Sequence, residues 1–353
     1  MAKKGQSRVA ADEAKSYLRQ MMQIRKFEDG IMELLSRNIA QGGSHLSAGQ
    51  EAVPVGVMAA IRPDDYITST HRGHGHCIAK SVSATGKANL DVFMAEILGK
   101  AAGCCSGKGG SLHLADVSTG NLGANGVVAG GIGMATGAGI TIRTRKTDQV
   151  CICFFGDGAL NEGIFHESAN MAAAWRLPVL YLVENNLYGM SVAVSRASNL
   201  TPDELHLRAK AYKMPGETID GQDVLGVRDT VGQYVEKMRE GAGPALLVCN
   251  TYRYYGHSRS DPRAYRTREE EAFWKGRDPI LLFAKQCQDQ KILSKDECDA
   301  VDRETDAEMK SAIDFAVESP EPDPKELFTD VYAPAFEAGE EEADWLAAAA
   351  ETR

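Results

Sequence analysis

The chain lacks several features that would place it in a broad class of proteins. It has no run of about 20 apolar residues, so no membrane-spanning helix is expected. Acidic residues outnumber Lys and Arg by 49 to 39, and the net charge of −10 argues against nucleic-acid binding, which needs clustered positive charge. The basic first residues precede no apolar stretch, so a secretory signal is not expected either. A cytoplasmic protein that binds neither membrane nor nucleic acid is the default expectation.

The eight cysteines lack the spacing of a metal site or a redox motif, because no two of them form a Cys-x-x-Cys pair. Cys104 and Cys105 are adjacent in the sequence. Cys151 and Cys153 alternate within an apolar run, so we expect them to face the same side of a buried strand. The sequence therefore predicts reduced structural thiols.

The chain does contain short apolar runs that alternate with stretches of helical periodicity. This order predicts βαβ units, and hence an α/β fold with a mainly parallel sheet flanked by helices. The predicted strands are 66–70, 150–155, 179–183 and 245–249, and the predicted helices are 10–38, 50–61, 127–142, 161–175, 223–239 and 294–318.

These elements divide the chain into three predicted parts. Residues 1–40 would form an N-terminal helical arm, residues 41–335 the α/β domain, and residues 336–353 a C-terminal extension. The polar stretch 253–268 is expected to be an exposed loop.

Polar, turn-forming residues follow two of the apolar runs. Gly156-Asp157-Gly158 ends one run, and Glu184-Asn185-Asn186 ends the next. Ligands of parallel α/β sheets bind at the carboxyl ends of the strands, so both turns should lie at one edge. The Asp157 carboxylate, the Asn186 amide oxygen and a backbone carbonyl from the turn at Tyr188 are hard oxygen ligands of the kind that suit magnesium.

The glycines on both sides of Asp157 let the backbone approach a phosphate group closely and leave amide groups free as donors. A helix expected to begin near Asn161 would point its N-terminus at the same place, which also favours an anion. Neither turn is specific alone, since Gly-Asp-Gly and Asn-Asn occur in many plain turns. Together, each after an apolar strand, they predict a site for magnesium and a phosphate-bearing ligand.

This combination of turns resembles the motif of thiamine diphosphate enzymes, with the corresponding thiamine diphosphate-binding fold. The segment 155–189 resembles the alpha subunit of the decarboxylating component of pyruvate and branched-chain 2-oxo acid dehydrogenase complexes, and of acetoin dehydrogenase. The resemblance covers about residues 15–335. Further motifs that carry it are Gly49-Gln50-Glu51-Ala52, Thr70-His71-Arg72-Gly73-His74-Gly75-His76, Gly107-Lys108-Gly109-Gly110-Ser111-Leu112-His113, Gly123-Ala124-Asn125-Gly126-Val127-Val128 and Tyr252-Arg253-Tyr254-Tyr255-Gly256-His257-Ser258.

The resemblance implies a set of ligands for the metal and the cofactor. Asp157, Asn186 and the Tyr188 carbonyl would hold Mg²⁺, and the planar Arg72 guanidinium suits a phosphate. The implied contacts to thiamine diphosphate are His71, Arg72, Gly126, Val128, Gly156, Asp157, Gly158, Ala159, Asn186 and His257, with Gly126 and Val128 at the aminopyrimidine ring.

Two histidines, His74 and His257, match the active-site histidines of the family. The resemblance implies that they are catalytic, handling protons during acyl transfer and stabilising diphosphate charge. A lone histidine is often only a structural residue, but both lie in Gly-flanked stretches expected to be loops. The cluster of His71, His74 and His76 could instead suggest zinc, although no Cys or Asp partner has matching spacing.

One catalytic group is missing from the chain. Thiamine enzymes need a glutamate beside the aminopyrimidine, and no convincing candidate lies well upstream of Gly156. In the family that the chain resembles, this glutamate belongs to a beta subunit. The resemblance therefore implies an α2β2 heterotetramer that is inactive without its beta subunit, and a lipoyl-bearing acyltransferase that accepts the acyl group.

The expected substrate is a pyruvate-like 2-oxo acid, with acetoin as the alternative. The stretch 256–262 resembles pyruvate-type members of the family. Thr218 stands where many of those members have Arg, and the surrounding stretch 215–221 resembles acetoin-type members. His71 replaces the more common Tyr, as it does in some acetoin-type members.

Three other functions compete with this interpretation. Gly131, Gly133 and Gly137 resemble a dinucleotide fingerprint, but no apolar strand directly precedes them, which argues against an NAD-dependent dehydrogenase. A noncatalytic scaffolding subunit would not need the intact metal ligands. The third is a thiamine enzyme that uses no lipoyl partner.

Overall fold

The computed structural model describes residues 9–330. The chain divides into two compact units, Met1–Pro320 and Glu321–Arg353. The described part of the second unit contains one short 3-10 helix, η5 (Pro324–Phe328). The expected C-terminal extension 336–353 lies outside the described residues, and the division at residues 40 and 335 stays a prediction. Within residues 9–330, no helix is both long and apolar enough to cross a bilayer.

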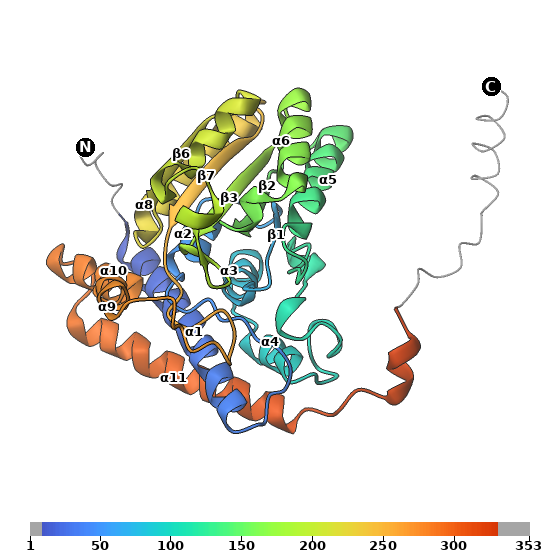
Figure 1. Cartoon of the computed structure of the whole chain (residues 1–353). Helices are drawn as coiled ribbons and strands as arrows, with labels where there is room; N and C mark the ends of the chain where they lie inside the picture. Colours follow the sequence, from blue (N-terminus) through green and yellow to red (C-terminus); the bar gives the residue numbers. More distant parts are fainter. Residues whose placement is uncertain (1–8, 331–353) are drawn as a thin grey trace. The chain divides into compact units, whose positions relative to one another are not determined.

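The first unit is built around a five-stranded sheet with the order β1-β2-β3-β7-β6 (Figure 1). All four pairings are parallel, so the predicted α/β fold with a mainly parallel sheet is confirmed. The edge strand β6 was not predicted, because its sequence Gly-Glu-Thr-Ile-Asp contains no apolar run and pairs only with β7. The strands are β1 (Tyr66–Thr68), β2 (Cys151–Gly156), β3 (Val179–Asn185), β6 (Gly216–Asp220) and β7 (Ala245–Asn250).

Helices cover both faces of the sheet, so its central strands are apolar on both sides, as expected for a parallel sheet. Ile152 and Phe154 enter one core, whereas Cys151 and Cys153 enter the other, which confirms that the two cysteines share a face. The helices of the second core include α5 (Gly130–Arg145), α6 (Gly163–Trp175) and the 3-10 helix η4 (Pro202–Tyr212). Those of the first core include α1 (Ala11–Ser36), α2 (Ala52–Met58), α3 (His74–Thr85), α4 (Leu90–Ile97), α8 (Val224–Arg239), α10 (Pro279–Asp289) and α11 (Lys295–Glu318).

The remaining elements are short. They are the antiparallel pair β4 (Tyr188–Gly189) and β5 (Val192–Ala193), the helices α7 (Val194–Ala197) and α9 (Arg268–Lys275), and the 3-10 turns η1 (Gly110–Leu112), η2 (Val117–Thr119) and η3 (Ala159–Asn161).

The stretch around His74 is a helix, and the expectation of a loop there was wrong. Helix α3 begins at His74 and contains Gly75, a residue that weakens helices. The glycine is needed for packing, because a Cβ at Gly75 would lie 3.2 Å from the Ile24 Cγ2 atom and 3.3 Å from the Pro54 Cγ atom. Close contact with α1 and α2 therefore outweighs the low helix propensity.

The stretch 253–268 is only partly exposed, so the expectation of an exposed loop there was wrong. Arg253 is 1% exposed and Arg266 is 9% exposed. Arg266 Nη1 donates hydrogen bonds to the carbonyl oxygens of Arg253 and Tyr255, at 2.9 and 3.1 Å, and its guanidinium lies 4.5 Å from the Tyr252 ring centroid. Backbone acceptors and aromatic rings replace part of the water that two buried cations would otherwise need, although the Nε atoms of both arginines have no hydrogen-bond partner among the described residues.

The buried Glu96 side chain organises the glycine-rich loop that follows α4. Its Oε2 atom accepts the backbone N–H groups of Cys105 and Gly107, at 2.8 and 2.9 Å. Its Oε1 atom accepts those of Gly109 and Gly110, at 2.8 and 2.9 Å. One carboxylate therefore satisfies four amides and fixes the loop that leads into η1.

Replacing this carboxylate should destabilise the protein strongly. We expect Glu96→Ala to lower the free energy of unfolding by about 3 kcal/mol or more, because four charge-assisted hydrogen bonds are lost and their donors stay partly buried. Urea unfolding followed by circular dichroism measures the change. The matched control is Glu236→Ala on the exposed side of α8, which should change stability by no more than about 0.5 kcal/mol. Equal urea midpoints for the two variants would contradict this role of Glu96.

Candidate functional site

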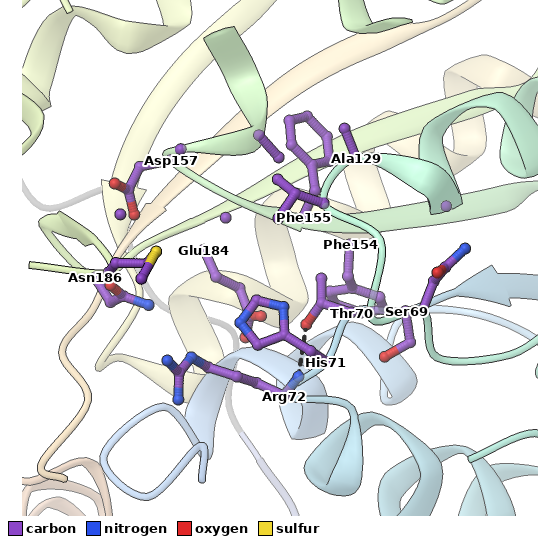
Figure 2. Close-up of a pocket in the computed structure, with 18 of the residues that line it drawn as sticks. Ser69, Thr70, His71, Arg72, Ala129, Phe154, Phe155, Asp157, Glu184 and Asn186 are labelled. Atoms are coloured by element: carbon purple, nitrogen blue, oxygen red, sulfur yellow. Dashed lines mark hydrogen bonds between the residues drawn. The ribbon is translucent and has the colours of Figure 1, made fainter. Parts of the chain in front are cut away.

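A cavity of about 260 Å³ lies at the carboxyl ends of β2 and β3. These strands pair in parallel with Gly156 opposite Glu184, so the turns that follow them reach the same edge of the sheet. Asp157 and Asn186 both line the cavity, and Figure 2 shows them on the same side of it. The two strand ends thus meet as the sequence predicts.

Most of the residues predicted as ligands line this cavity. Gly126 and His74 are not among its lining residues: Gly126 packs near His113, and His74 is fully buried. The predicted residues that do line it are His71, Arg72, Val128, Gly156, Asp157, Gly158, Ala159, Asn186, Tyr188 and His257.

The Asp157 carboxylate is almost completely buried, with 4% of the residue exposed. Burial raises the pKa of Asp157 to about 6, and backbone hydrogen bonds and the nearby Arg253 offset only part of that effect. A carboxylate that has lost its water in this way is stabilised in its ionised form by a bound cation.

The turn after β3 places further oxygen atoms close to Asp157. The Asn186 amide nitrogen donates a hydrogen bond to the Gln50 side-chain oxygen at 3.2 Å, which fixes the orientation of the amide. Leu187 has a φ of 76°, a left-handed conformation that non-glycine residues rarely adopt and that turns the chain back toward the edge. Arg253 Nη1 donates a hydrogen bond to the Tyr188 carbonyl at 3.3 Å. A carbonyl oxygen has two lone pairs, so this one can still accept a second partner.

Two buried cations also line the cavity. Arg72 and Arg253 are 4% and 1% exposed. Arg72 donates hydrogen bonds to the carbonyl oxygens of Leu46 and His257, at 2.9 and 3.0 Å, and Figure 2 shows its side chain extending toward the side that holds Asp157 and Asn186. Burial, together with the charge of Arg253, lowers the pKa of Arg72 to about 9.

Three imidazole rings lie beside these cations. The ring centroids of His45, His71 and His257 are 4.7–5.9 Å apart. Burial and the neighbouring Arg72 lower the pKa values of His45, His71 and His257 to about 4, 2 and 4. The His45 Nδ1 atom is buried and has no hydrogen-bond partner within the described part of the chain. The cluster would therefore gain protons and hydrogen bonds if an anion entered the cavity.

The charges of the cavity are complementary to a metal–phosphate group. On one side, a desolvated carboxylate and neighbouring oxygens are suited to a divalent cation. Next to them, two buried arginines repel each other, and the three histidines nearby would be favoured in their charged forms by a bound anion. A polyphosphate with a bound divalent ion would relieve both conditions at once, so the residues present fit such a group.

His74 occupies a separate buried position. Its Nδ1 atom lies 2.8 Å from the Glu28 carboxylate, and its Nε2 atom lies 2.9 Å from the Ser111 hydroxyl. Burial opposes the ionised form of Glu28, but His74 and Ser47 outweigh it and lower the pKa of Glu28. An ionised Glu28 fixes the Nδ1–H tautomer of His74. The catalytic role of His74 stays a prediction.

The zinc and dinucleotide alternatives find no support in this geometry. His71 lines the cavity, His74 pairs with Glu28, and the Nδ1 atom of His76 lies 2.7 Å from the Ser69 hydroxyl, so the three imidazoles have different surroundings. Gly131 and Gly137 lie inside α5 and not in a loop between a strand and a helix. A dinucleotide fingerprint requires such a loop.

Three important residues of the site were not singled out from the sequence: Gln50 and Arg253 line the cavity, and His45 packs against the lining residues His71 and His257. His45 has no spacing relation to the other histidines, and only the fold brings it to His71. Gln50 and Arg253 lie in motifs that carry the family resemblance, but neither was assigned a role, and Arg253 was placed in an exposed loop. Their position inside those motifs was the available signal.

Comparisons with known proteins identify the family of this chain. The family model described as "Dehydrogenase E1 component" matches residues 19–325. The chain is 44% identical over 320 residues to the alpha subunit of acetoin:2,6-dichlorophenolindophenol oxidoreductase from Bacillus subtilis, a match that covers 90% of this chain and 93% of that protein. It is 40% identical over 321 residues to the alpha subunit of the pyruvate dehydrogenase E1 component from Rhizobium meliloti, covering 91% of this chain and 90% of that protein.

The family match therefore extends across the sheet, the helices on both of its faces and every residue that lines the cavity. On this evidence, the chain belongs to the dehydrogenase E1 component family.

Proposed function

We propose that the cavity holds the diphosphate of thiamine diphosphate together with Mg²⁺. The observation that carries the proposal is the buried charge of both signs at the cavity: the carboxylate of Asp157 and the guanidinium groups of Arg72 and Arg253. Asp157, Asn186 and the Tyr188 carbonyl would hold the metal. Thiamine diphosphate supplies an electron sink for cleavage of a bond next to a carbonyl group.

The chain's own residues bind and orient the cofactor. Arg72, His71 and His257 would contact the diphosphate oxygens, with Gly156, Gly158 and Ala159 allowing a close approach of the backbone. Gly126 and Val128 would contact the aminopyrimidine ring through their backbone. Of the two predicted catalytic histidines, His257 lines the cavity with its ring beside Arg72, and His74 would act from its buried position beside Ser111.

The activity that fits these residues is oxidative decarboxylation of a pyruvate-like 2-oxo acid, with transfer of the acyl group to a lipoyl group on an acyltransferase. In this assignment the chain is the alpha subunit of an α2β2 heterotetramer. Three large apolar side chains at the cavity, Val127, Val128 and Met190, are 69%, 53% and 63% exposed. Their exposure supports a partner subunit that covers this surface. The beta subunit would bring the catalytic glutamate that this chain does not provide.

Acetoin cleavage is the alternative reaction, and one feature of the cavity favours it. His71 lines the site at a position where a tyrosine is more common, and the relative from B. subtilis is named for acetoin. The second acetoin-type feature, Thr218, lies away from the cavity, on β6, where its hydroxyl contacts His206 at 2.9 Å. It therefore does not contribute directly to the choice of substrate.

The proposal is tested by producing the chain together with its beta subunit and measuring turnover of pyruvate, branched-chain 2-oxo acids and acetoin with an artificial electron acceptor. We expect activity with one of these substrates only when thiamine diphosphate and Mg²⁺ are both present, and none from either subunit alone. Full turnover without the cofactor or without a divalent ion would overturn the assignment. The matched control is the chain produced without the beta subunit.

A further inference from the structure

The Cys104–Cys105 pair differs from the other cysteines of the chain. Cys104 and Cys105 are half-buried, whereas Cys77, Cys151, Cys153, Cys249, Cys287 and Cys298 are buried. The two sulfur atoms of the pair lie 3.9 Å apart, within sulfur hydrogen-bond distance of each other. A reagent from solution can therefore reach two adjacent thiols that already contact one another.

A metal site is the first chemistry to consider here, because Glu96, Cys104 and Cys105 offer ligand atoms within 4.8 Å of one another. The carboxylate, however, is fully engaged. Each of its oxygens already accepts two backbone N–H groups of the loop. Binding a metal through Glu96 would release these amides, so the geometry leaves a dithiol without a third side-chain ligand among residues 9–330.

The contact between the two thiols activates one of them. A hydrogen bond from Cys104 is the largest influence on Cys105 and lowers its pKa to about 7, against burial and the negative charges of Glu96 and Asp116. Burial instead raises the pKa of Cys77 to about 12, and that of Cys153 to about 12. When protonated, the Cys105 thiol lies 3.6 and 3.7 Å from the carbonyl oxygens of His113 and Ala115, distances at which sulfur donates only weakly.

We propose that Cys105 is a site of oxidation by hydroperoxides and that Cys104 resolves the product to a vicinal disulfide. The Cys105 thiolate attacks one peroxide oxygen, the O–O bond breaks, and the leaving oxygen takes up a proton as water or alcohol. The resulting sulfenic acid is attacked by the Cys104 sulfur, so that an S–S bond forms, the S–O bond breaks, and the hydroxyl leaves with the Cys104 proton as water. The two thiols lose two electrons, which reduce the peroxide.

The disulfide should be easily reduced again. Adjacent Cα atoms are about 3.8 Å apart, less than the spacing found in ordinary disulfides, so a vicinal disulfide is strained and more reducible. Bond formation also requires the sulfur atoms to approach from 3.9 Å to about 2 Å. The 104–105 peptide must shift for this to happen, and its N–H donor to Glu96 shifts with it.

Mass spectrometry and thiol labelling of the full-length protein test the proposal. With a small excess of hydrogen peroxide at pH 7, we expect a loss of about two hydrogens, located on a peptide with linked Cys104 and Cys105 and reversed by dithiothreitol. Without peroxide, iodoacetamide should label Cys105 at least about tenfold faster than Cys77. Cys104→Ser should stop at a sulfenic acid on Cys105 that dimedone traps.

Cys105→Ser is the matched variant and should lose the peroxide reaction altogether. Three results would overturn the proposal. The first is that both thiols stay reduced at a peroxide concentration that oxidises glutathione. The second is a disulfide formed between other cysteines at the same rate. The third is equal peroxide sensitivity in the wild type and in Cys105→Ser.

Discussion

Asp157→Asn should stabilise the cofactor-free protein and at the same time remove most of its affinity for Mg²⁺ and thiamine diphosphate. Burial holds the pKa of Asp157 at about 6, above the ordinary value of 3.8. The difference between these values corresponds to about 3 kcal/mol by which the ionised side chain destabilises the folded state. Asparagine has nearly the same shape but carries no charge, so it escapes this cost.

The stability that Asp157→Asn gains over the wild type should increase with pH. Because the folded-state pKa is raised, the folded protein binds more protons than the unfolded chain between about pH 4 and 6. Wild-type stability therefore falls as the pH rises through this window and stays lower above it. The advantage of Asp157→Asn should be absent below about pH 4, grow up to about pH 6, and then remain constant. Urea unfolding at a series of pH values measures it.

Cofactor binding should change in the opposite sense. Losing a charged ligand from a magnesium site should weaken binding of Mg²⁺ and thiamine diphosphate by about 100-fold or more, measured by isothermal titration calorimetry with the α2β2 protein. Asp289→Asn, an exposed carboxylate at the end of α10, is the matched control and should alter neither property. Unchanged cofactor affinity in Asp157→Asn would refute the metal role of this carboxylate.

The sequence predicts the metal side of the site well because that side depends on local structure. The runs 150–155 and 179–183 are apolar throughout, which identifies them as buried parallel strands. Once both are strands of one parallel sheet, the turns that follow them must share an edge. Asp157 and Asn186 therefore come together for reasons visible in two short segments.

The cationic side is predicted less well because it depends on contacts between distant segments. His45 reaches His71 and His257 only after the chain has folded. The polar composition of 253–268 suggests a solvent-exposed loop. The Arg253 guanidinium is nevertheless buried and donates hydrogen bonds to the Tyr188 carbonyl and the Tyr265 hydroxyl. Composition gives the number of polar groups in a segment and does not identify the acceptors that allow them to be buried.

Removing the charge of Arg72 should abolish the stabilisation that the cofactor confers on the protein. A ligand present at 100 times its Kd stabilises the folded state by about 2.7 kcal/mol. At the concentrations of thiamine diphosphate and Mg²⁺ that give this gain in the wild type, we expect Arg72→Met to gain less than about 1 kcal/mol. In this variant the diphosphate loses a buried cation that would bind it, and the repulsion between Arg72 and Arg253 that the anion relieves in the wild type is already gone. Thermal unfolding of the α2β2 protein with and without the cofactor measures the gain.

Arg72→Lys separates the effect of charge from that of geometry. Arg72 uses two nitrogens at once to reach the carbonyl oxygens of Leu46 and His257, and this fork fixes the direction of the guanidinium. Lysine keeps the charge but presents a single ammonium group, so it should recover only part of the cofactor-dependent gain. Arg145→Met, an exposed cation at the end of α5, should retain all of it. If the cofactor stabilised Arg72→Met as much as the wild type, other residues would have to hold the diphosphate. Charge complementarity between Arg72 and the diphosphate would then not explain cofactor binding.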